Sequence, residues 1–326
     1  MTHERKYPRS NELTAVVNRD LFDIPPGAIR PKDMPRWTAY RNDYHKAAKL
    51  ELVTDFPLQI DFELNSTCQM KCGFCLHGHT KVPKRHLTFE QFCKVIDEGA
   101  EHGLVSIKLN YINEPLLNKD LPMYVDYARS RGVLNIYFAT NGLLLTEDMS
   151  RRLIESKVSK IMISLDAATP ETFFKMRANK NFDQIVNNIY RFLEIRGDLN
   201  YPLVRINFLQ TPVNQHEATE FISQWKDIVD MVGFQQCVGL PGVEYGEMVH
   251  QDDFRCAFPY KLVAIDSAGN ILPCCTFSGR EMPLGHIDDM TIAEAWNGEK
   301  MTALREQHRQ YKYAENPVCA HCINGG

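Results

Sequence analysis

The sequence lacks any run of about 18 apolar residues, the length that a helix needs to cross a membrane. Its first ten residues, MTHERKYPRS, are polar and lack the apolar core of a secretory signal peptide. The formal net charge of -4 leaves no excess of basic residues for binding nucleic acid or an anionic membrane. These absences predict a soluble, cytoplasmic protein whose main partner is neither a nucleic acid nor a membrane.

Ten cysteines are present among 326 residues, but the compartment predicted above does not favour a disulfide framework. Clustered thiols in a reducing compartment are more typical of metal sites. Cys93 and Cys237 stand apart in the sequence, and we expect them to be small buried residues without a chemical role. The others form an early group, Cys68, Cys72 and Cys75, and a late group, Cys256, Cys274, Cys275, Cys319 and Cys322.

The early group lacks a fourth cysteine. Its C-x3-C-x2-C spacing directly follows an apolar run, residues 56–64, that predicts a buried strand. A [4Fe–4S] cluster normally takes four thiolates, so three would leave one iron with an open coordination position. An open position is how a metal centre holds a reactant. Structural zinc is the alternative, because Cys72 and Cys75 are spaced like half of a zinc site.

Short β-like runs alternate with amphipathic helical stretches over most of the chain. Such alternation predicts an α/β fold with a parallel sheet joined by right-handed crossovers. Thr88 and Thr146 have the character of helix N-caps, each followed by acidic residues. The predicted strands are 58–64, 105–110, 134–139, 160–165, 203–209 and 233–238, and the predicted helices are 88–102, 120–131, 146–156, 182–196 and 215–232.

The three-cysteine loop, with the aromatic Phe74 before its last cysteine, resembles the signature of the radical SAM enzymes. In that family the open iron chelates S-adenosylmethionine, and reduction releases a 5′-deoxyadenosyl radical that removes a substrate hydrogen. The six strand–helix units match the family's partial (β/α)6 TIM-like barrel, with an active site at the carboxyl ends of the strands. This resemblance divides the chain into an N-terminal extension over 1–55, a barrel over 56–240 and a C-terminal domain over 241–326. The extension, with a helix predicted over 37–50, is expected to pack on the outside of the barrel.

Polar segments follow the predicted strands in the order that the resemblance implies. The segment 111–117 is similar to the family's Gly-Gly-Glu-Pro motif, with Ile112 and Asn113 where two glycines are usual. Each segment alone is also typical of an ordinary turn, so their order carries the assignment. An arginine suits a carboxylate because its planar fork donates two parallel hydrogen bonds. The residues that the resemblance assigns to S-adenosylmethionine are Phe74, Asn113, Glu114, Asn141, Ser164, Asp166, Arg177 and Asn207.

The late cysteines flank a predicted β-hairpin over 262–272 with a Gly-Asn turn. Cys256, Cys274, Cys319 and Cys322 make a four-thiolate set that resembles the shortened SPASM, or twitch, domain with one auxiliary [4Fe–4S] cluster. Structural zinc is again the alternative. The spacing Gly269-x4-Cys274 favours Cys274 as the ligand, although the neighbouring Cys275 would serve if the two exchange roles. Cys275 is otherwise either a small buried residue or a hydrogen donor to a substrate radical.

Together the resemblances imply two [4Fe–4S] clusters and S-adenosylmethionine as cofactors, with flavodoxin or ferredoxin as an external electron donor. The chain resembles the twitch-type 2-deoxy-scyllo-inosamine dehydrogenases, which implies oxidation of an alcohol in a polar small molecule, sugar- or cyclitol-like, with the auxiliary cluster accepting an electron. Epimerisation with Cys275, or less favourably Cys237, returning the hydrogen is an alternative. Modification of a peptide is another, against which the short extension counts modestly. A non-catalytic electron-transfer or zinc protein would need no open iron position.

Overall fold

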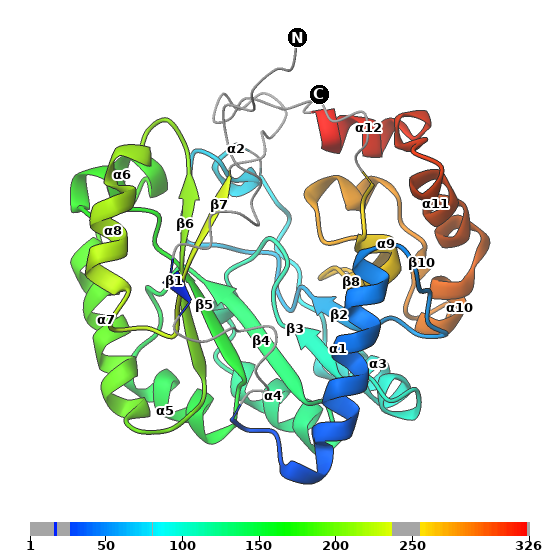
Figure 1. Ribbon diagram of the computed structural model, residues 1–326, viewed down its shortest axis with the longest axis horizontal. Coiled ribbons are helices and arrows are strands. Elements are labelled where there is room, and N and C mark those ends of the chain that lie inside the picture. Colours follow the sequence, from blue (N-terminus) through cyan, green and yellow to red (C-terminus); the bar gives the residue numbers. More distant parts are fainter. Residues whose placement is uncertain (1–15, 18–26, 80, 237–254, 325–326) are drawn as a thin grey trace.

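The computed structural model describes residues 16–17, 27–79, 81–236 and 255–324. Within them, ten strands form one continuous sheet in the order β1-β7-β6-β5-β4-β3-β2-β8-β9-β10. Strands β2 to β7 pair in parallel, each with the next along the chain. Figure 1 shows these strands with most of their connecting helices on one side of the sheet. The predicted α/β fold with a partial barrel is confirmed.

Each predicted strand is present close to its expected bounds. The helix predicted over 215–232 is wrong at its end, because it stops before Val232. That segment forms a short 3-10 turn, η3 (Gln215–Glu217), and then α8 (Ala218–Trp225), after which the chain returns to the sheet. The strands are β1 (Val16–Val17), β2 (Gln59–Phe62), β3 (Ser106–Lys108), β4 (Asn135–Thr140), β5 (Lys160–Ser164), β6 (Leu203–Gln210) and β7 (Met231–Gln236).

The helices between the strands begin at the residues that the sequence marks as caps. Thr88 and Gln91 form a reciprocal capping box at the start of α3, and the Thr146 side chain caps α5. Helix α6 was not predicted from the sequence, although Thr169 followed by Pro170 is a helix-start signal. The helices are α2 (Leu76–His79), α3 (Phe89–Glu101), η2 (Pro115–Leu117), α4 (Leu121–Ser130), α5 (Glu147–Glu155), α6 (Pro170–Arg177) and α7 (Phe182–Arg196).

The two faces of the parallel strands differ in chemistry. One face carries apolar side chains such as Ile60 and Phe62, which join the main core against the helices. Successive side chains of a strand point to opposite faces, so the alternate residues line the inner side of the barrel, which we call the lumen. Apolar side chains also face the lumen, among them Ala139, Met162, Leu203 and Met231. The polar lumen residues are Gln59, Asp61, Glu63, Ser106, Lys108, Asn110, Asn135, Tyr137, Lys160, Ser164, Arg205 and Asn207.

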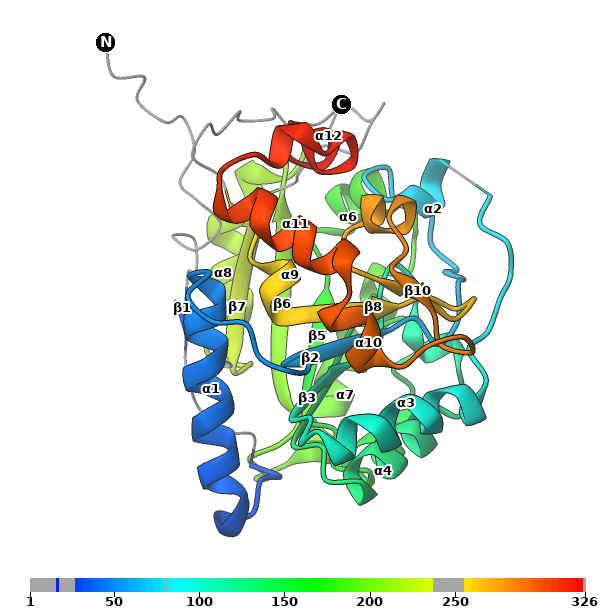
Figure 2. The ribbon, with the colours of Figure 1, turned by 90° about the vertical axis from the view of Figure 1, so that its right-hand side faces the viewer.

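The N-terminal helix α1 (Met34–Ala48), preceded by η1 (Pro31–Asp33), closes the lumen instead of packing on the outside as expected. Trp37 and Tyr40 are buried with Val105 and Leu134, at the start of β3 and β4. Tyr40, Arg41 and Tyr44 of α1 also lie around one crevice with the lumen residues Gln59, Tyr137 and Lys160. The helix therefore supplies an aromatic wall for the lumen, since it crosses in front of the strands in Figure 1 and stands beside them, at the left, in Figure 2.

The C-terminal segment extends the barrel sheet. The predicted hairpin is present as β8 (Leu262–Ile265) and β9 (Asn270–Leu272), followed by β10 (Gly285–His286). β8 also pairs in parallel with β2, a contact that the sequence did not predict. The predicted boundary at 240/241 lies outside the described residues. The remaining helices are α9 (Phe258–Lys261), η4 (Phe277–Glu281), α10 (Ile292–Asn297), α11 (Glu299–Arg309), η5 (Tyr313–Glu315) and α12 (Pro317–Asn324).

Candidate active site at the carboxyl ends of the strands

The three-thiol loop follows β2 and contacts the loop after β4 and the end of α6. The Cys68 Sγ lies 3.4 Å from the Met70 backbone nitrogen and 3.9 Å from the Asn141 Nδ2. The Cys72 Sγ lies 3.7 Å from Nη1 of Arg177, at the end of α6. Burial raises the pKa of the Cys68 thiol to about 12, so the free thiol is protonated. Iron binding must therefore release this proton.

Glu114 joins the loops that follow β3 and β4. Its carboxylate accepts hydrogen bonds from the Leu116 backbone at 3.0 Å, from Thr140 Oγ1 at 2.7 Å and from the Asn141 backbone at 2.8 Å. The two loops are thereby held at a fixed separation beside Cys68. The neighbouring Asn113 accepts from the Tyr111 backbone at 2.9 Å, while its buried Nδ2 has no partner among the described residues. This amide N–H is a donor available to a bound group.

Asp166 and Arg177 form a buried ion pair next to the three-thiol loop. Asp166 adopts a left-handed backbone conformation (φ 61°), and its other carboxylate oxygen accepts from the Leu209 backbone at 2.7 Å. The Arg177 guanidinium also lies 5.3 Å from the centre of the Phe74 ring. Burial alone would lower the pKa of Arg177, but Asp166 and Cys72 raise it above its ordinary value. The guanidinium is therefore a fixed positive charge beside the thiols.

Ser164 and Asn207 are register partners on β5 and β6, at the same edge of the sheet. The Asn207 backbone carbonyl accepts from the backbones of Leu165 and Asp166, and its buried Oδ1 has no partner among the described residues. The structure thus brings the predicted cosubstrate residues to one edge. Of these residues, Asn141 and Arg177 contact the thiols of the three-thiol loop directly. Asn113, Ser164 and Asn207 have no described contact with a cysteine.

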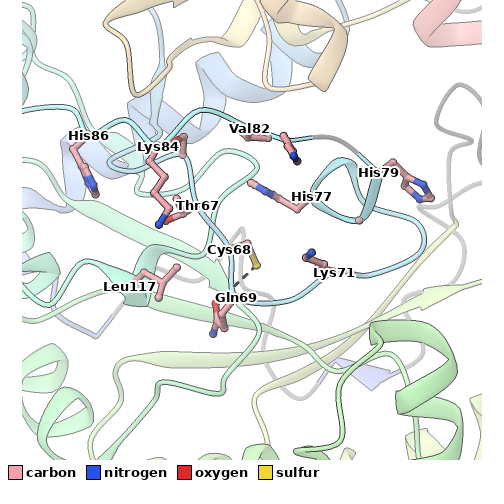
Figure 3. Close-up of a pocket in the computed structure, with 13 residues that line it drawn as sticks. Thr67, Cys68, Gln69, Lys71, His77, His79, Val82, Lys84, His86 and Leu117 are labelled. Atoms are coloured by element: carbon pink, nitrogen blue, oxygen red, sulfur yellow. Dashed lines mark hydrogen bonds between the residues drawn. The ribbon is translucent and has the colours of Figure 1, made fainter.

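A pocket of about 730 Å³ lies beside the same loop. It is bordered by Cys68 and Thr67 on one side and by the segment after α2 on the other (Figure 3). Basic and imidazole side chains dominate this rim: Lys71, His77, His79, Lys81, Lys84 and His86. A positively charged rim favours the approach of an acidic partner.

The four late cysteines predicted as ligands come together. The Cys256 thiol lies within electrostatic range of Cys274, Cys319 and Cys322, and burial raises its pKa. No group of three or more His, Cys, Asp or Glu side chains within the described ranges converges on a single metal ion. A [4Fe–4S] cluster instead binds one thiolate at each of four irons, so its ligands need not converge on one point.

Adjacent cysteines 274 and 275 face different surroundings. Cys274 neighbours Cys322 and the Thr276 hydroxyl, 3.3 Å away, within the four-thiol set. Cys275 packs against Tyr111, Ala264 and Leu272, and Ala264 is the register partner of the lumen residue Asp61. Burial first, then the Asp61 charge, raises the pKa of Cys275 to about 12. The geometry therefore favours Cys274 as the ligand and leaves Cys275 beside the lumen.

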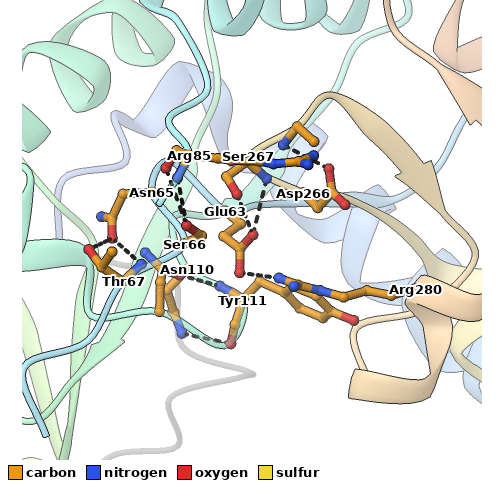
Figure 4. A network of polar contacts seen from close by, with 12 residues as sticks. Glu63, Asn65, Ser66, Thr67, Arg85, Asn110, Tyr111, Asp266, Ser267 and Arg280 are labelled. Carbon is orange, nitrogen blue, oxygen red and sulfur yellow. Dashed lines mark hydrogen bonds and ion pairs between the residues drawn. The ribbon is translucent and has the colours of Figure 1, made fainter. Parts of the chain in front are cut away.

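A buried polar network connects the barrel to the C-terminal segment (Figure 4). Glu63, at the end of β2, accepts from the Ser267 backbone at 3.1 Å, from the Ser267 hydroxyl at 2.8 Å and from Arg280. The Arg280 guanidinium lies 5.1 Å from the centre of the Tyr111 ring, and Tyr111 donates to the Thr276 carbonyl. Both cysteine groups are thus fixed to the same strand ends.

The charged lumen residues Asp61, Lys108 and Arg205 were not predicted from the sequence. Asp61 and Lys108 are register partners whose charged atoms lie 3.7 Å apart. The sequence did contain a signal for a polar face of this strand, because residues 59–64 alternate strictly between polar and apolar side chains. A strand buried on two apolar faces would show no such alternation.

None of the helices in the described ranges combines the length and apolar character needed to cross a membrane.

Two family models match this chain. Residues 62–207 match the radical SAM superfamily, and residues 256–323 match an iron–sulfur cluster-binding domain named SPASM. Relatives include a probable GTP 3′,8-cyclase of Methanocaldococcus jannaschii, 24% identical over 166 residues, and the mycofactocin maturase MftC of Mycolicibacterium smegmatis, 30% identical over 171 residues. Each alignment covers 51% of this chain and respectively 54% and 41% of the relative. The chain thus spans about half the length of the curated relatives it matches.

Solved structures show the same fold. A complex of BtrN with AdoMet and 2-DOIA has a TM-score of 0.59 at 18% identity, covering 84% of this chain and 95% of that one. Native anSMEcpe with bound AdoMet has a TM-score of 0.61 at 15% identity, covering 77% and 84%. Streptococcus suis SuiB bound to the precursor peptide SuiA has a TM-score of 0.57 at 15% identity, covering 83% and 71%. Residues 62–207 are therefore a radical SAM domain and residues 256–323 a SPASM domain, and this pair of domains implies S-adenosylmethionine and two [4Fe–4S] clusters as cofactors.

Proposed function

We propose that this protein oxidises an alcohol carbon of a polar small molecule held in the lumen. The observation that carries the proposal is the polar lumen itself, which lies between the three-thiol loop and the side of the C-terminal domain that holds Cys275. When bound, S-adenosylmethionine and the two clusters supply a 5′-deoxyadenosyl radical and an electron acceptor. With these groups bound, the alcohol carbon would lose a hydrogen atom, its hydroxyl a proton and the resulting carbon radical one electron, which leaves a ketone.

The residues of this chain bind and orient the reactants. Arg177, kept charged by Asp166, is placed to hold the cosubstrate carboxylate, and the free Asn113 amide is a further donor. Lys108, held by Asp61, presents a cation to substrate hydroxyls from the other side of the lumen. Tyr40 and Tyr44 of α1 restrict entry of water from the amino ends of the strands. The likeness to BtrN, whose solved complex contains 2-DOIA, supports a cyclitol- or sugar-like substrate.

The test is anaerobic turnover of the reconstituted protein with reductant, S-adenosylmethionine and candidate cyclitols or aminosugars. We expect 5′-deoxyadenosine and a ketone product two mass units below the substrate, with deuterium transferred from the labelled carbon. A Cys68→Ala variant is the matched control and should form neither product. Cleavage of S-adenosylmethionine with a product of unchanged mass would reject oxidation.

Epimerisation is the second candidate, because Cys275 lies beside the lumen and outside the four-thiol set. Its thiol would return a hydrogen atom to the opposite face of the substrate carbon, and the resulting sulfur radical would need one electron and one proton from the reductant and solvent. A Cys275→Ala variant should then form 5′-deoxyadenosine without epimer, whereas an oxidase would keep its product. The relatives MftC and SuiB bring a peptide substrate as a further alternative, which the same mass analysis would detect.

The basic rim beside Cys68 is the proposed contact for the external electron donor, an acidic flavodoxin- or ferredoxin-like protein. Charge attraction between the two would speed their encounter and weaken with salt. Replacement of Lys71 and Lys84 by Glu should slow reduction by flavodoxin at low salt but leave reduction by dithionite unchanged. Equal slowing with both reductants would reject this contact.

A further inference from the structure

Arg205 occupies an unusual position in the lumen. It lies on β6, two residues before Asn207 and on the same face, and it is the register partner of Met162 and Met231. A Cβ atom added to Gly233 would lie 2.2 Å from the Arg205 Nε and Nη2 atoms. The guanidinium therefore lies directly over the Gly233 backbone, in space that any other residue would fill. A side chain at position 233 would therefore have to displace the guanidinium.

Arg205 makes no hydrogen bond or ion pair with any described residue, and its Nε is buried without an acceptor. Arg177 and Arg196 also have a buried Nε without an acceptor, but unlike Arg205 they have a protein partner at another nitrogen, as does Arg129. Arg129 donates to carbonyl oxygens, Arg177 to Asp166 and Arg196 to Asp230. Burial lowers the pKa of Arg205, and no carboxylate acts in the opposite direction.

The acidic side chains of the lumen are already paired. Asp61 lies 3.7 Å from Lys108, and both carboxylate oxygens of Glu63 are used by Arg280 and Ser267. Among the described lumen residues, no carboxylate is therefore left to balance Arg205. Withdrawing a charge from water without a partner costs several kcal/mol, so such a group persists where a ligand supplies the missing charge.

We propose that Arg205 anchors an oxyanion of the substrate, a carboxylate or a phosphate, in the lumen. The planar guanidinium suits both groups, because it donates two parallel hydrogen bonds to adjacent oxygens. Two residues of a strand span about 6.6 Å, so the anion sits one layer below Asn207, on the inner side of the predicted cosubstrate residues. This inference rests on the proposed function for placing the substrate in the lumen, and it narrows that substrate to an acid or a phosphate ester.

The first test is the stability of full-length variants loaded with both clusters and S-adenosylmethionine. Arg205→Met removes a charge that has no protein partner, so its melting temperature should equal or exceed that of the wild type. Arg196→Met is the matched control and should melt several degrees lower, because it removes the largely buried ion pair between Arg196 and Asp230. An equal fall in the two variants would mean that the protein itself pairs Arg205, which would overturn the inference.

The second test is binding without turnover. Inorganic phosphate, glucose 6-phosphate and glucuronate should raise the melting temperature of the wild type by about 2–4 °C, whereas glucose and sodium chloride at equal ionic strength should not. A larger effect of glucuronate or of glucose 6-phosphate distinguishes the two oxyanions. Gly233→Ala keeps every charge but displaces the guanidinium, so this variant and Arg205→Met should both lose the effect.

Identical shifts in the wild type, Arg205→Met and Gly233→Ala would overturn the inference, since they would show that the anions bind elsewhere. The absence of any anion shift in the wild type would overturn it as well. Neither result depends on catalysis, so the proposed oxidation succeeds or fails separately.

Discussion

Glu63, the residue after β2, accepts a hydrogen bond from Arg280, 217 residues further along the chain. The Glu63 carboxylate is 1% exposed and the Arg280 side chain 23% exposed, so the pair is largely withdrawn from water. The same carboxylate accepts from Ser267. One acidic side chain therefore fixes the orientation of the C-terminal domain on the barrel.

Glu63→Gln should lower the free energy of unfolding by about 2 kcal/mol, because the amide keeps the acceptor for Ser267 but leaves Arg280 without its countercharge. Urea denaturation of the reconstituted protein measures this difference. Glu90→Gln, at an exposed site in the first turn of α3, is the control and should change stability by about 0.5 kcal/mol or less. Equal effects of the two substitutions would contradict the role given to Glu63.

Asp166 combines a charge with a backbone conformation, and two substitutions separate these roles. Asp166→Asn should cost about 2–3 kcal/mol through the unpaired Arg177, because asparagine tolerates the left-handed conformation and still accepts from Leu209. Asp166→Ala should cost about 1 kcal/mol more, since alanine is strained at positive φ and has no acceptor. Thermal denaturation of both variants checks the order. If the Asp166→Ala variant is as stable as Asp166→Asn, the left-handed backbone conformation carries no energetic cost for alanine.

The assignment of Cys274 over Cys275 predicts different metal contents. The reconstituted wild type should hold about eight irons, Cys274→Ser about four, and Cys275→Ser about eight, because a single auxiliary [4Fe–4S] cluster depends on Cys274. Iron and sulfide analysis, with electron paramagnetic resonance of the reduced protein, measures the difference. Cys93→Ser, outside both groups, is the control and should match the wild type. If Cys275→Ser held about four irons and Cys274→Ser about eight, Cys275 would be the ligand in place of Cys274.

The buried Asp61 predicts a pH effect with a definite sign. Burial raises the pKa of its carboxyl above the ordinary value of 3.8, against the opposing charge of Lys108. The folded state therefore binds its proton more tightly than the unfolded state, and this contribution to stability, fully present below pH 3.8, is lost as the pH rises through the folded pKa. Asp61→Asn should gain stability relative to the wild type as the pH is raised from about 4 to 8. A difference that is constant with pH would contradict the raised pKa.

The order of strands and helices was predictable because each element carries a local signal. Thr88 and Thr146 mark helix starts by their side-chain chemistry, and the structure places the helices directly after them. The cysteine groups were predictable for the same reason, since ligand spacing is short along the chain. The pairing of Asp166 with Arg177 was not predicted, although both residues were assigned to one site, because no local pattern specifies which polar groups satisfy each other.

The polar lumen and the helix α1 that closes it were not predicted, for two different reasons. Residues 59–64 were interpreted as one buried strand, although their alternation already separates Ile60 and Phe62 from Asp61 and Glu63. The position of α1 and the pairing of β2 with β8 depend on contacts between distant segments, which local periodicity does not encode. The apolar run 262–265 predicts a strand but not its neighbour.

The parallel pairing of β2 with β8 makes the two cluster-bearing regions a single hydrogen-bonded unit. A protein shortened to its barrel would leave the backbone N–H and C=O groups of β2 bare along one side, next to the loop that holds the three thiols. Such a naked edge recruits strands from other molecules. In chimaeras that exchange the C-terminal domain between relatives, β2 and β8 should therefore come from the same parent protein. A chimaera with a mismatched pair of strands will precipitate before its chemistry can be compared.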